Sequence, residues 1–307
     1  MVQQECMEEE NMKNQKFIYQ TKKIQVLLHQ AIQELHHYPM NHTITYAGFF
    51  GVKNWGDAIN SILLQQLSGK TPIISPLGKQ SNRCLLKTSE IIYSFIGSTL
   101  ELASKKKNLI VYGTGFMNSN DRIIQKPKKI CAVRGPLTAE RIIESIEDCP
   151  KIYGDPAVLF KRYYQPKADK KYNLGIVPHW SDYQKISHCY ANIPGVHVIN
   201  AESGSTQFID EICSCRCIAS SSLHGLIMAD TYDIPTVWIK MISGLHPDDF
   251  KFYDYYGSIR CEREPINLFS WNIDDICSGT DLISHPINSE KLLMACPFLQ
   301  PHTEQSR

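Results

Sequence analysis

The chain has 307 residues, of which 43% are hydrophobic, so it can bury a sizeable core and wholesale disorder is excluded. Lys and Arg number 32 against 31 Asp and Glu, which gives a formal net charge of +1 and argues against a dedicated nucleic-acid binder. The sequence holds no apolar run long enough to cross a membrane. Its N-terminus is acidic and lacks the apolar core of a signal peptide, so we expect a cytoplasmic protein.

Eleven cysteines are an odd number for a disulfide framework in a chain of this length. The tightest group is Cys213, Cys215 and Cys217, with a spacing that matches no common zinc motif. The histidines are scattered and form no paired metal-binding pattern. We therefore predict reduced, mostly buried thiols and no metal site.

Residues 1–40 are predicted to form an N-terminal tail and one amphipathic helix. Apolar residues recur at helical spacing from Phe17 to Leu35, and Pro39 follows the pattern. One interpretation packs this helix against the core. The other lays it on a partner or on a membrane surface, and the latter would bring the protein to the inner face of the membrane.

From residue 41 onward, short β-rich runs alternate with helical runs, which is typical of parallel sheets covered by helices. The segment 85–102 is ambiguous and predicted to be helical in part. The basic segment 161–171 contains Pro166 and predicts a linker. We therefore expect an α/β protein with two Rossmann-like domains, residues 41–165 and 172–307, that face a cleft.

The predicted elements follow in chain order. Strands are predicted at Ile44–Phe50, Pro72–Ser75, Asn108–Tyr112, Lys129–Val133, Lys151–Tyr153, Leu174–Val177, Val196–Ile199, Cys217–Ala219 and Thr236–Ile239. Helices are predicted at Asp57–Leu67, Pro136–Glu147, Thr206–Cys213, Leu223–Tyr232 and Ser289–Ala295, with an aromatic helix beyond Lys251. Ligands of such sheets bind at the carboxyl ends of the strands, so the loops that follow the strands carry the candidate site.

The segment SSSLHG joins a strand to a helix and is the most informative of these loops. Ser220, Ser221 and Ser222 precede the helix that opens at Leu223, and the free N–H groups of a helix start favour anions. Ser222 is predicted to cap this helix. His224 in the first turn could bind a phosphate or donate a proton. The alternative is that Ser222 only caps the helix and His224 only packs.

The segment GFFGVKNWGDAIN leads from a strand into a second helix. Asp57 is a candidate base with Asn54 as its hydrogen-bonding neighbour, and the alternative makes Asp57 the cap of the helix. Arg134 ends another strand, where its guanidinium suits carboxylate or phosphate, unless it forms an ordinary salt bridge.

Two further turns are candidate contacts with a ligand. Gly113 and Gly115 form a tight loop that would let a ligand approach the backbone closely. Asp155 precedes a proline, and this turn could bind the substrate or serve only the fold.

In this order, the segments NWGDAIN, GTG, AVRGPLT, YGDPAVLF and SSSLHGLIMADTYDIP resemble the polysaccharide pyruvyl transferase family over about residues 44–257. The resemblance implies a two-domain fold like that of GT-B glycosyltransferases. It also implies transfer of the enolpyruvyl-derived group of phosphoenolpyruvate to two hydroxyls of a sugar, leaving a pyruvate ketal. The implied partners are phosphoenolpyruvate as donor and a saccharide acceptor, free or lipid-linked. No cofactor and no nucleic acid are implied.

The resemblance assigns roles to individual residues. Arg134 matches a donor-binding arginine and His224 the motif histidine, so we expect His224 to act as acid or phosphate ligand and Asp57 as base. The helix start at Ser220–Ser222 would complete the anion clamp. We expect replacement of Arg134 or His224 by alanine to abolish ketal formation while the fold stays intact.

One position departs from the family pattern. Many relatives have Arg-Leu-His where this chain has Ser222-Leu223-His224, although exopolysaccharide-type members, which it resembles more closely, also have a small residue there. The missing positive charge is expected from Lys240, Lys53 or another cation of the cleft.

Two other functions stay open at this point. The first is a glycosyltransferase that uses a nucleotide sugar on the same architecture. The second is a non-catalytic carbohydrate-binding subunit, for which the serine at position 222 is the best support.

Overall fold

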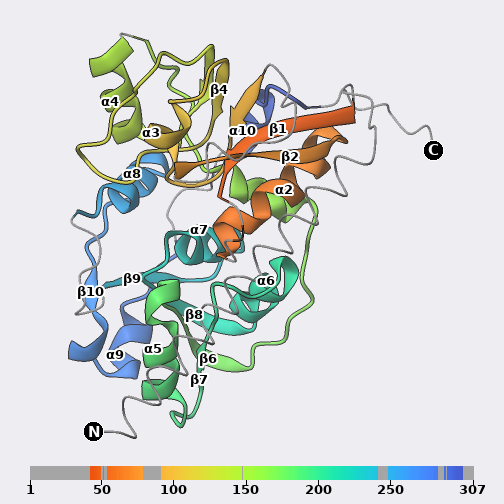
Figure 1. Ribbon diagram of the computed structural model, residues 1–307. Coiled ribbons are helices and arrows are strands. Elements are labelled where there is room, and N and C mark those ends of the chain that lie inside the picture. The colour runs from red at the N-terminus through yellow and green to blue at the C-terminus, as the bar shows by residue number, and fades with distance from the viewer. Residues whose placement is uncertain are drawn as a thin grey trace, which may run out of the picture.

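The computed structural model describes residues 42–49, 51, 54–78, 91–146, 148–240, 248–282, 287 and 289–299. These residues form two five-stranded sheets, each with all strands parallel, one in each half of the chain. Figure 1 shows the first sheet at the top and the second at the bottom, with helices between and around them. The predicted α/β fold of two Rossmann-like halves is confirmed.

The first sheet has the strand order β2-β1-β3-β4-β5. Its strands are β1 (Thr43–Gly48), β2 (Thr71–Pro76), β3 (Ile92–Ser94), β4 (Leu109–Tyr112) and β5 (Lys129–Ala132). The helices of this half are α2 (Trp55–Ser68), α3 (Leu100–Ala103) and α4 (Pro136–Ile146), followed by the 3₁₀ helix η3 (Pro156–Arg162). Residue Gly69 takes a left-handed conformation (φ 64°) and ends α2, because glycine alone adopts it without strain.

The second sheet has the order β10-β9-β8-β6-β7. Its strands are β6 (Tyr172–Val177), β7 (Val196–Val198), β8 (Cys215–Ser220), β9 (Thr236–Lys240) and β10 (Ile266–Asn267). The second half of the chain contains the helices α5 (Tyr183–Tyr190), α6 (Ser205–Cys213), α7 (Leu223–Thr231), α8 (Phe250–Ser258), α9 (Ile273–Ser278) and α10 (Ser289–Met294). It also contains the 3₁₀ helices η4 (Trp180–Asp182) and η5 (Leu268–Ser270).

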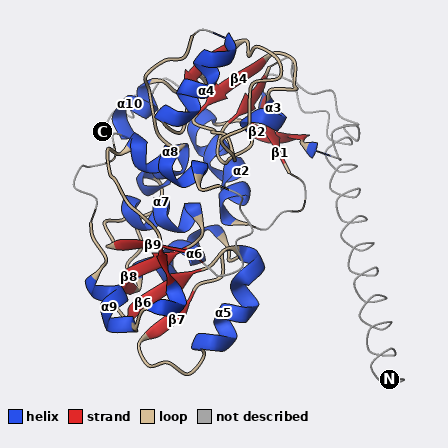
Figure 2. Cartoon of the chain, turned by 90° about the vertical axis from the view of Figure 1, so that its left-hand side faces the viewer, coloured by secondary structure: helices blue, strands red, loops and turns tan. Residues whose placement is uncertain are grey.

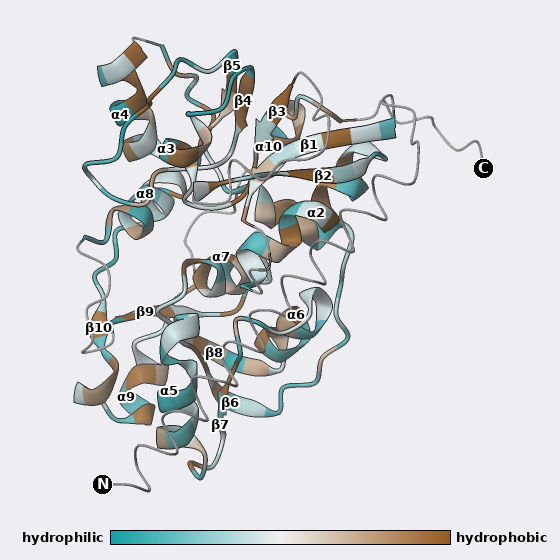
Figure 3. Cartoon of the chain, in the orientation of Figure 1, coloured by the Kyte–Doolittle hydropathy of each residue, from teal (hydrophilic) through white to brown (hydrophobic). Residues whose placement is uncertain are grey.

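One hydrophobic core runs from one half into the other. Figure 2 shows α2, α6 and α7 between the two sheets, and Figure 3 shows apolar strands inside each half with more polar helix surfaces outside. Trp55 at the start of α2 is almost fully buried and stacks on Phe208 of α6, with ring centroids 5.3 Å apart. Its indole N–H donates to the carbonyl of Ser205 over 2.8 Å. Trp55 thus ties the first half to the second, and burial of so large a side chain stabilises their contact.

The end of the chain returns to the first half. Helix α8 packs against α4, and α10 packs against η3. The hydroxyl of Tyr112 in β4 donates to the carbonyl of Leu292 in α10 over 2.8 Å. The predicted domain boundaries, 41–165 and 172–307, stay a prediction, and the second range includes these two helices that contact the first half.

The predicted strands and helices within the described residues are mostly confirmed, with shifts of a residue or two at their ends. Lys151–Tyr153 forms only a single β-bridge, between Tyr153 and Val133. The prediction for 85–102 missed strand β3, because that strand is only three residues long and carries no alternating pattern. Helix α5 was missed as well.

Two sequence-based predictions fall where the structure gives no description. The amphipathic helix Phe17–Leu35 and the candidate cation Lys53 lie outside the described residues. Across the residues that are described, no helix is both long enough and apolar enough to span a bilayer.

Candidate active site

The strand order points to the place where a ligand should bind. In an order such as β2-β1-β3, connections from neighbouring strands leave in opposite directions, and a crevice opens beyond the carboxyl ends of these strands. The first sheet has this switch point between β1 and β3, and the second has it between β6 and β8. A cavity of about 400 Å³ is lined by loops from both points. These loops contribute Asn54 and Asp57, Ser98 and Thr99, His179 and Trp180, and Ser222 and His224.

His224 lies in the first turn of α7, where the sequence predicted it, and its side chain borders the cavity. Its Nε2 lies 3.5 Å from Oδ2 of Asp155, which is almost fully buried. Neither of these two atoms has a hydrogen-bond partner among the described residues. The imidazole nitrogen and the carboxylate oxygen thus face each other at the cavity wall, and an imidazole is the side chain most often used for proton transfer.

Asp155 therefore has a different position from the substrate contact expected of it. It does not border the cavity but lies behind His224, and its Oδ1 accepts a 3.0 Å hydrogen bond from the N–H of Ala157. This bond caps η3 and holds the carboxylate in place.

Gly56 of α2 contacts the imidazole from the other half of the chain. A Cβ atom at this position would lie 2.1 Å from Nδ1 of His224, which is far inside van der Waals contact. Only glycine allows α2 and the histidine to approach this closely. The fit sets the position of His224 relative to Asp57, the next residue of the same helix.

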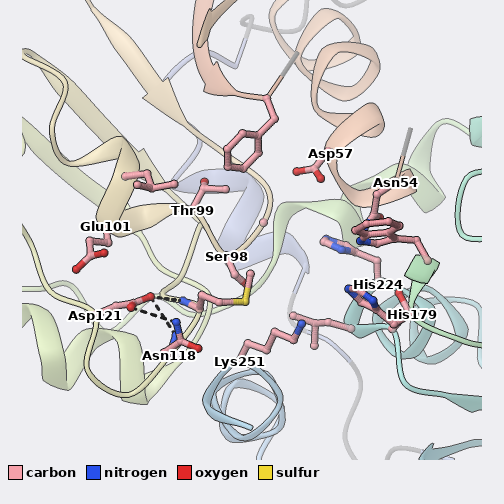
Figure 4. A pocket seen from close by; sticks show the side chains of 17 residues that line it. Asn54, Asp57, Ser98, Thr99, Glu101, Asn118, Asp121, His179, His224 and Lys251 are labelled. Carbon is pink, nitrogen blue, oxygen red and sulfur yellow. Dashed lines mark hydrogen bonds between the residues drawn. The ribbon is translucent and has the colours of Figure 1, made fainter. Parts of the chain in front are cut away.

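Asp57 borders the cavity from the first turn of α2. Burial raises the pKa of this carboxyl above its usual range, while the positive charge of His224 opposes the rise. A carboxylate with a raised pKa is a better proton acceptor than an ordinary one. Asn54, not Asp57, caps the helix: its side-chain oxygen accepts from the N–H of Gly56 over 3.1 Å. The side chain of Asp57 is thus left for the cavity, as Figure 4 shows.

The three serines before α7 differ in the contacts that their side chains make. Ser220 is fully buried, where its hydroxyl contacts the carbonyl of Val177 at 2.9 Å and accepts from the N–H of Ser222. The hydroxyl of Ser221 accepts from the N–H of His179 over 3.0 Å. Ser222 stands at the N-cap position but makes no capping bond, which corrects the predicted cap. Of the three, Ser222 borders the cavity, beside the start of α7.

Arg134 is fully buried and does not border the cavity. Its Nε donates a hydrogen bond of 2.9 Å to Asp254. Its Nη1 donates to the hydroxyl of Ser98 and its Nη2 to the carbonyl of Phe116, each at a distance of 2.5 Å. Each guanidinium nitrogen thus has a protein partner. Direct contact with a donor, as expected from the sequence, would require breaking part of this network. In this arrangement Arg134 acts on the cavity through Ser98, which borders it.

Three other predicted contacts also lie away from the cavity. A Cβ at Gly113 would meet Pro156 at 2.2 Å, and one at Gly115 would meet Arg134 at 2.6 Å, so both glycines serve internal packing. Lys240 is exposed at the end of β9, where it pairs with Asp249. It therefore supplies no charge to the cavity.

Several residues that the sequence analysis did not single out also border the cavity, among them Lys251 and Trp180. Lys251 of α8 contributes a buried ammonium, and Trp180 contributes an indole that is 53% exposed. The described residues contain no group of three His, Cys, Asp or Glu side chains with metal-binding geometry. The chemistry available is that of an imidazole, carboxylates, an ammonium and N–H groups, which suits proton transfer next to a bound anion.

Comparison with known proteins agrees with this geometry. Residues 85–241, about half of the chain, match the polysaccharide pyruvyl transferase family. The chain belongs to this family. It is therefore a transferase of polysaccharide biosynthesis, as the order of its motifs predicted. The matched range includes Arg134, Asp155 and His224, whereas Asp57 and Lys251 lie on either side of it.

Individual relatives are distant. An uncharacterized protein, L143, of Acanthamoeba polyphaga mimivirus is 28% identical over 201 residues, covering 63% of this chain and 69% of the viral protein. The succinoglycan biosynthesis protein ExoV of Rhizobium meliloti (strain 1021) is 28% identical over 178 residues. That alignment covers 55% of this chain and about half, 54%, of ExoV. Among solved structures, MurG of Acinetobacter baumannii is similar with a TM-score of 0.42 and 11% identity, over 83% of this chain and 93% of MurG.

Proposed function

We propose that this protein transfers the enolpyruvyl-derived group of phosphoenolpyruvate to two hydroxyls of a sugar in the synthesis of an exopolysaccharide. The observation that carries the proposal is the meeting of His224, backed by Asp155, with Asp57 across one cavity. Ketal formation needs both an acid and a base at one anion-binding site. Membership of the family and the similarity to ExoV, a succinoglycan biosynthesis protein, support the substrate class.

In the proposed reaction His224 protonates the methylene carbon of the donor, and the neighbouring carbon becomes oxocarbenium-like. A sugar hydroxyl attacks that carbon, the bond to the phosphate oxygen breaks, and a second hydroxyl closes the ketal. Asp57 takes the proton of the attacking hydroxyl. The two sugar hydroxyls lose one proton each. One of these protons restores His224, which gave its own proton to the new methyl group, and the other leaves with the phosphate. The donor carries its own leaving group, so the proposal includes no cofactor.

The charges of the cavity favour one position for the donor. Figure 4 shows Glu101 and Asp121 at one side and His179 and His224 at the opposite side, with Lys251 pointing in from α8. A donor with a phosphate and a carboxylate would be repelled by the acidic side, so we assign it to the side of His224. Trp180 adjoins His179 on this side, with ring centroids 5.4 Å apart, and its exposed indole offers an apolar face to the sugar ring of the acceptor.

The location in the cell and the form of the acceptor belong to the same proposal. We propose that the protein acts in the cytoplasm on a saccharide, and that a lipid-linked saccharide would bring it to the inner face of the membrane.

The test is incubation of the purified chain with phosphoenolpyruvate and a panel of galactosides, glucosides and mannosides, read by mass spectrometry and by phosphate release. We expect one acceptor to gain a pyruvate ketal and to release one phosphate per ketal. A nucleotide-sugar arm tests the glycosyltransferase alternative. A thermal shift with both donors supports the assay, because a ligand at 100 times its Kd stabilises a protein by about 2.7 kcal/mol. Stabilisation by a nucleotide sugar alone, with no ketal on any acceptor, would refute the proposal.

A further inference from the structure

Lys251 is a buried cation that the proposed chemistry has not yet used. It is the second residue of α8, is only 7% exposed, and borders the cavity. Figure 4 shows its side chain reaching from α8 toward the middle of the cavity, between Ser98 on one side and His224 on the other. It thus brings a positive charge to the space where both switch points meet.

The carboxylates near Lys251 are already paired with other groups. Asp248 accepts from the N–H and the hydroxyl of Ser119, at 2.7 Å and 2.5 Å. Asp249 pairs with Lys240, and Asp254 with Arg134. No described residue forms a hydrogen bond or ion pair with the ammonium of Lys251, whose nearest ring, that of Phe252, has its centroid 5.1 Å away.

A largely buried ammonium that has a ring contact but no hydrogen-bond or ion-pair partner is costly, because it has lost part of its hydration and gained little in exchange. Burial and, to a smaller extent, the charge of Arg134 lower the pKa of Lys251 to about 8, against the opposing charge of Asp249. Asp57, Glu101, Asp121 and the two histidines complete the titratable groups that border the cavity. Asp121 is occupied, since it accepts from the N–H groups of Met117 and Asn118.

We propose that Lys251 binds an oxyanion of the donor, its phosphate or its carboxylate, and so supplies the positive charge that Ser222 lacks. The inference rests on the proposed function and adds a substrate-binding residue to it. The carboxylates next to α8 are bound to Ser119, Lys240 and Arg134, so we infer that an anionic ligand is the partner of Lys251. Lys240 and Arg134, two of the cations expected from the sequence, are both paired elsewhere.

The test is calorimetric titration of phosphoenolpyruvate, inorganic phosphate and pyruvate into wild type, Lys251→Met, Lys251→Arg and Lys70→Met. Methionine keeps the length of the side chain without its charge, and Lys70 is an exposed lysine that serves as the matched control. We expect Lys251→Met to weaken binding of phosphoenolpyruvate about ten- to hundredfold, the range for a lost charged hydrogen bond. Lys70→Met should bind like wild type. A loss with phosphate alone assigns Lys251 to the phosphate, and a loss with pyruvate alone assigns it to the carboxylate.

The pH dependence of wild type tests the inference without any variant. Affinity for phosphoenolpyruvate should fall as the pH rises through about 8, because Lys251 then loses its charge, and Lys251→Arg should stay flat over that range. Folded Lys251→Met that binds all three anions within twofold of wild type would overturn the inference, even if ketal formation proceeds. Wild type that binds phosphoenolpyruvate through Lys251 but forms no ketal would instead overturn the proposed function alone.

Discussion

Two buried polar clusters, one around Arg134 and one around His224, differ in how many of their polar atoms have hydrogen-bond partners. In the cluster of Arg134, Asp254 and Thr138, both carboxylate oxygens and all three guanidinium nitrogens have partners. In the cluster of His224 and Asp155, one nitrogen and one oxygen have none. A satisfied network stabilises one structure, whereas unsatisfied buried atoms at a cavity are available to a ligand. The comparison therefore indicates that Arg134 supports the structure of the site, whereas His224 and Asp155 act in it.

The largest effect should come from His224. We expect His224→Gln to lower kcat about 10²–10⁴-fold, because the side chain keeps a similar size but cannot transfer a proton at neutral pH. The temperature of unfolding should change little. Asp155→Asn serves as the companion variant, which keeps the size of the side chain but removes its charge. If His224→Gln turned over like wild type, the role of acid would have to pass to another residue.

The next effect concerns stability. It contradicts the expectation from the sequence that the fold stays intact when Arg134 is replaced by alanine. Arg134→Ala should destabilise the fold by about 3–5 kcal/mol, because it leaves the carboxylate of Asp254 buried without its partner. Any loss of activity should accompany this loss of stability. Urea unfolding measures it, with Arg141→Ala as control, since that arginine forms an exposed pair with Glu144. An unfolding free energy equal to that of wild type would restore Arg134 as a candidate for direct binding.

A smaller effect should follow from adding a methyl group at Gly56, where α2 contacts the ring of His224. Gly56→Ala places a methyl group on the ring of His224, and relief of such overpacking costs about 1–3 kcal/mol. We expect kcat to fall more than stability does, because the imidazole must move away from Asp57. Gly204→Ala is the control, since a Cβ there meets no atom within 4 Å. Equal kinetics for the two alanine variants would show that the position of His224 is less critical than we infer.

The smallest effect is expected at the acceptor side. Trp180→Ala should raise the KM for the sugar by about fivefold, as an aromatic contact of about 1 kcal/mol predicts, and leave the KM for phosphoenolpyruvate unchanged. Stability should not change, because the ring is 53% exposed. Steady-state kinetics with each substrate varied in turn measure both constants. A change in the KM for phosphoenolpyruvate alone would show that the acceptor does not bind beside Trp180.

The sequence predicted well what depends on neighbouring residues. The strand that leads into SSSLHG and the helix behind it follow from local patterns, and so does the position of His224 at the carboxyl end of β8. The same holds for Asp57 at the start of α2. Both residues therefore border the cavity as expected.

What the sequence could not predict depends on residues that are far apart in the chain. Arg134 looked like a ligand contact because its partner, Asp254, lies 120 residues away. Lys251 was missed because α8 leaves the second half and packs against α4 of the first. Asp155 was assigned to the substrate because its turn resembles a family motif, whereas its contact with His224 forms only when α7 and η3 meet.

The most direct test of the account is a crystal structure of the protein with phosphoenolpyruvate bound. The account predicts density for the donor between the two sheets, with one of its oxyanions at hydrogen-bonding distance from Nζ of Lys251 and its methylene carbon next to His224. The Arg134–Asp254 pair should stay intact. Donor density elsewhere on the molecule, with this cavity filled by solvent or by a nucleotide, would contradict it.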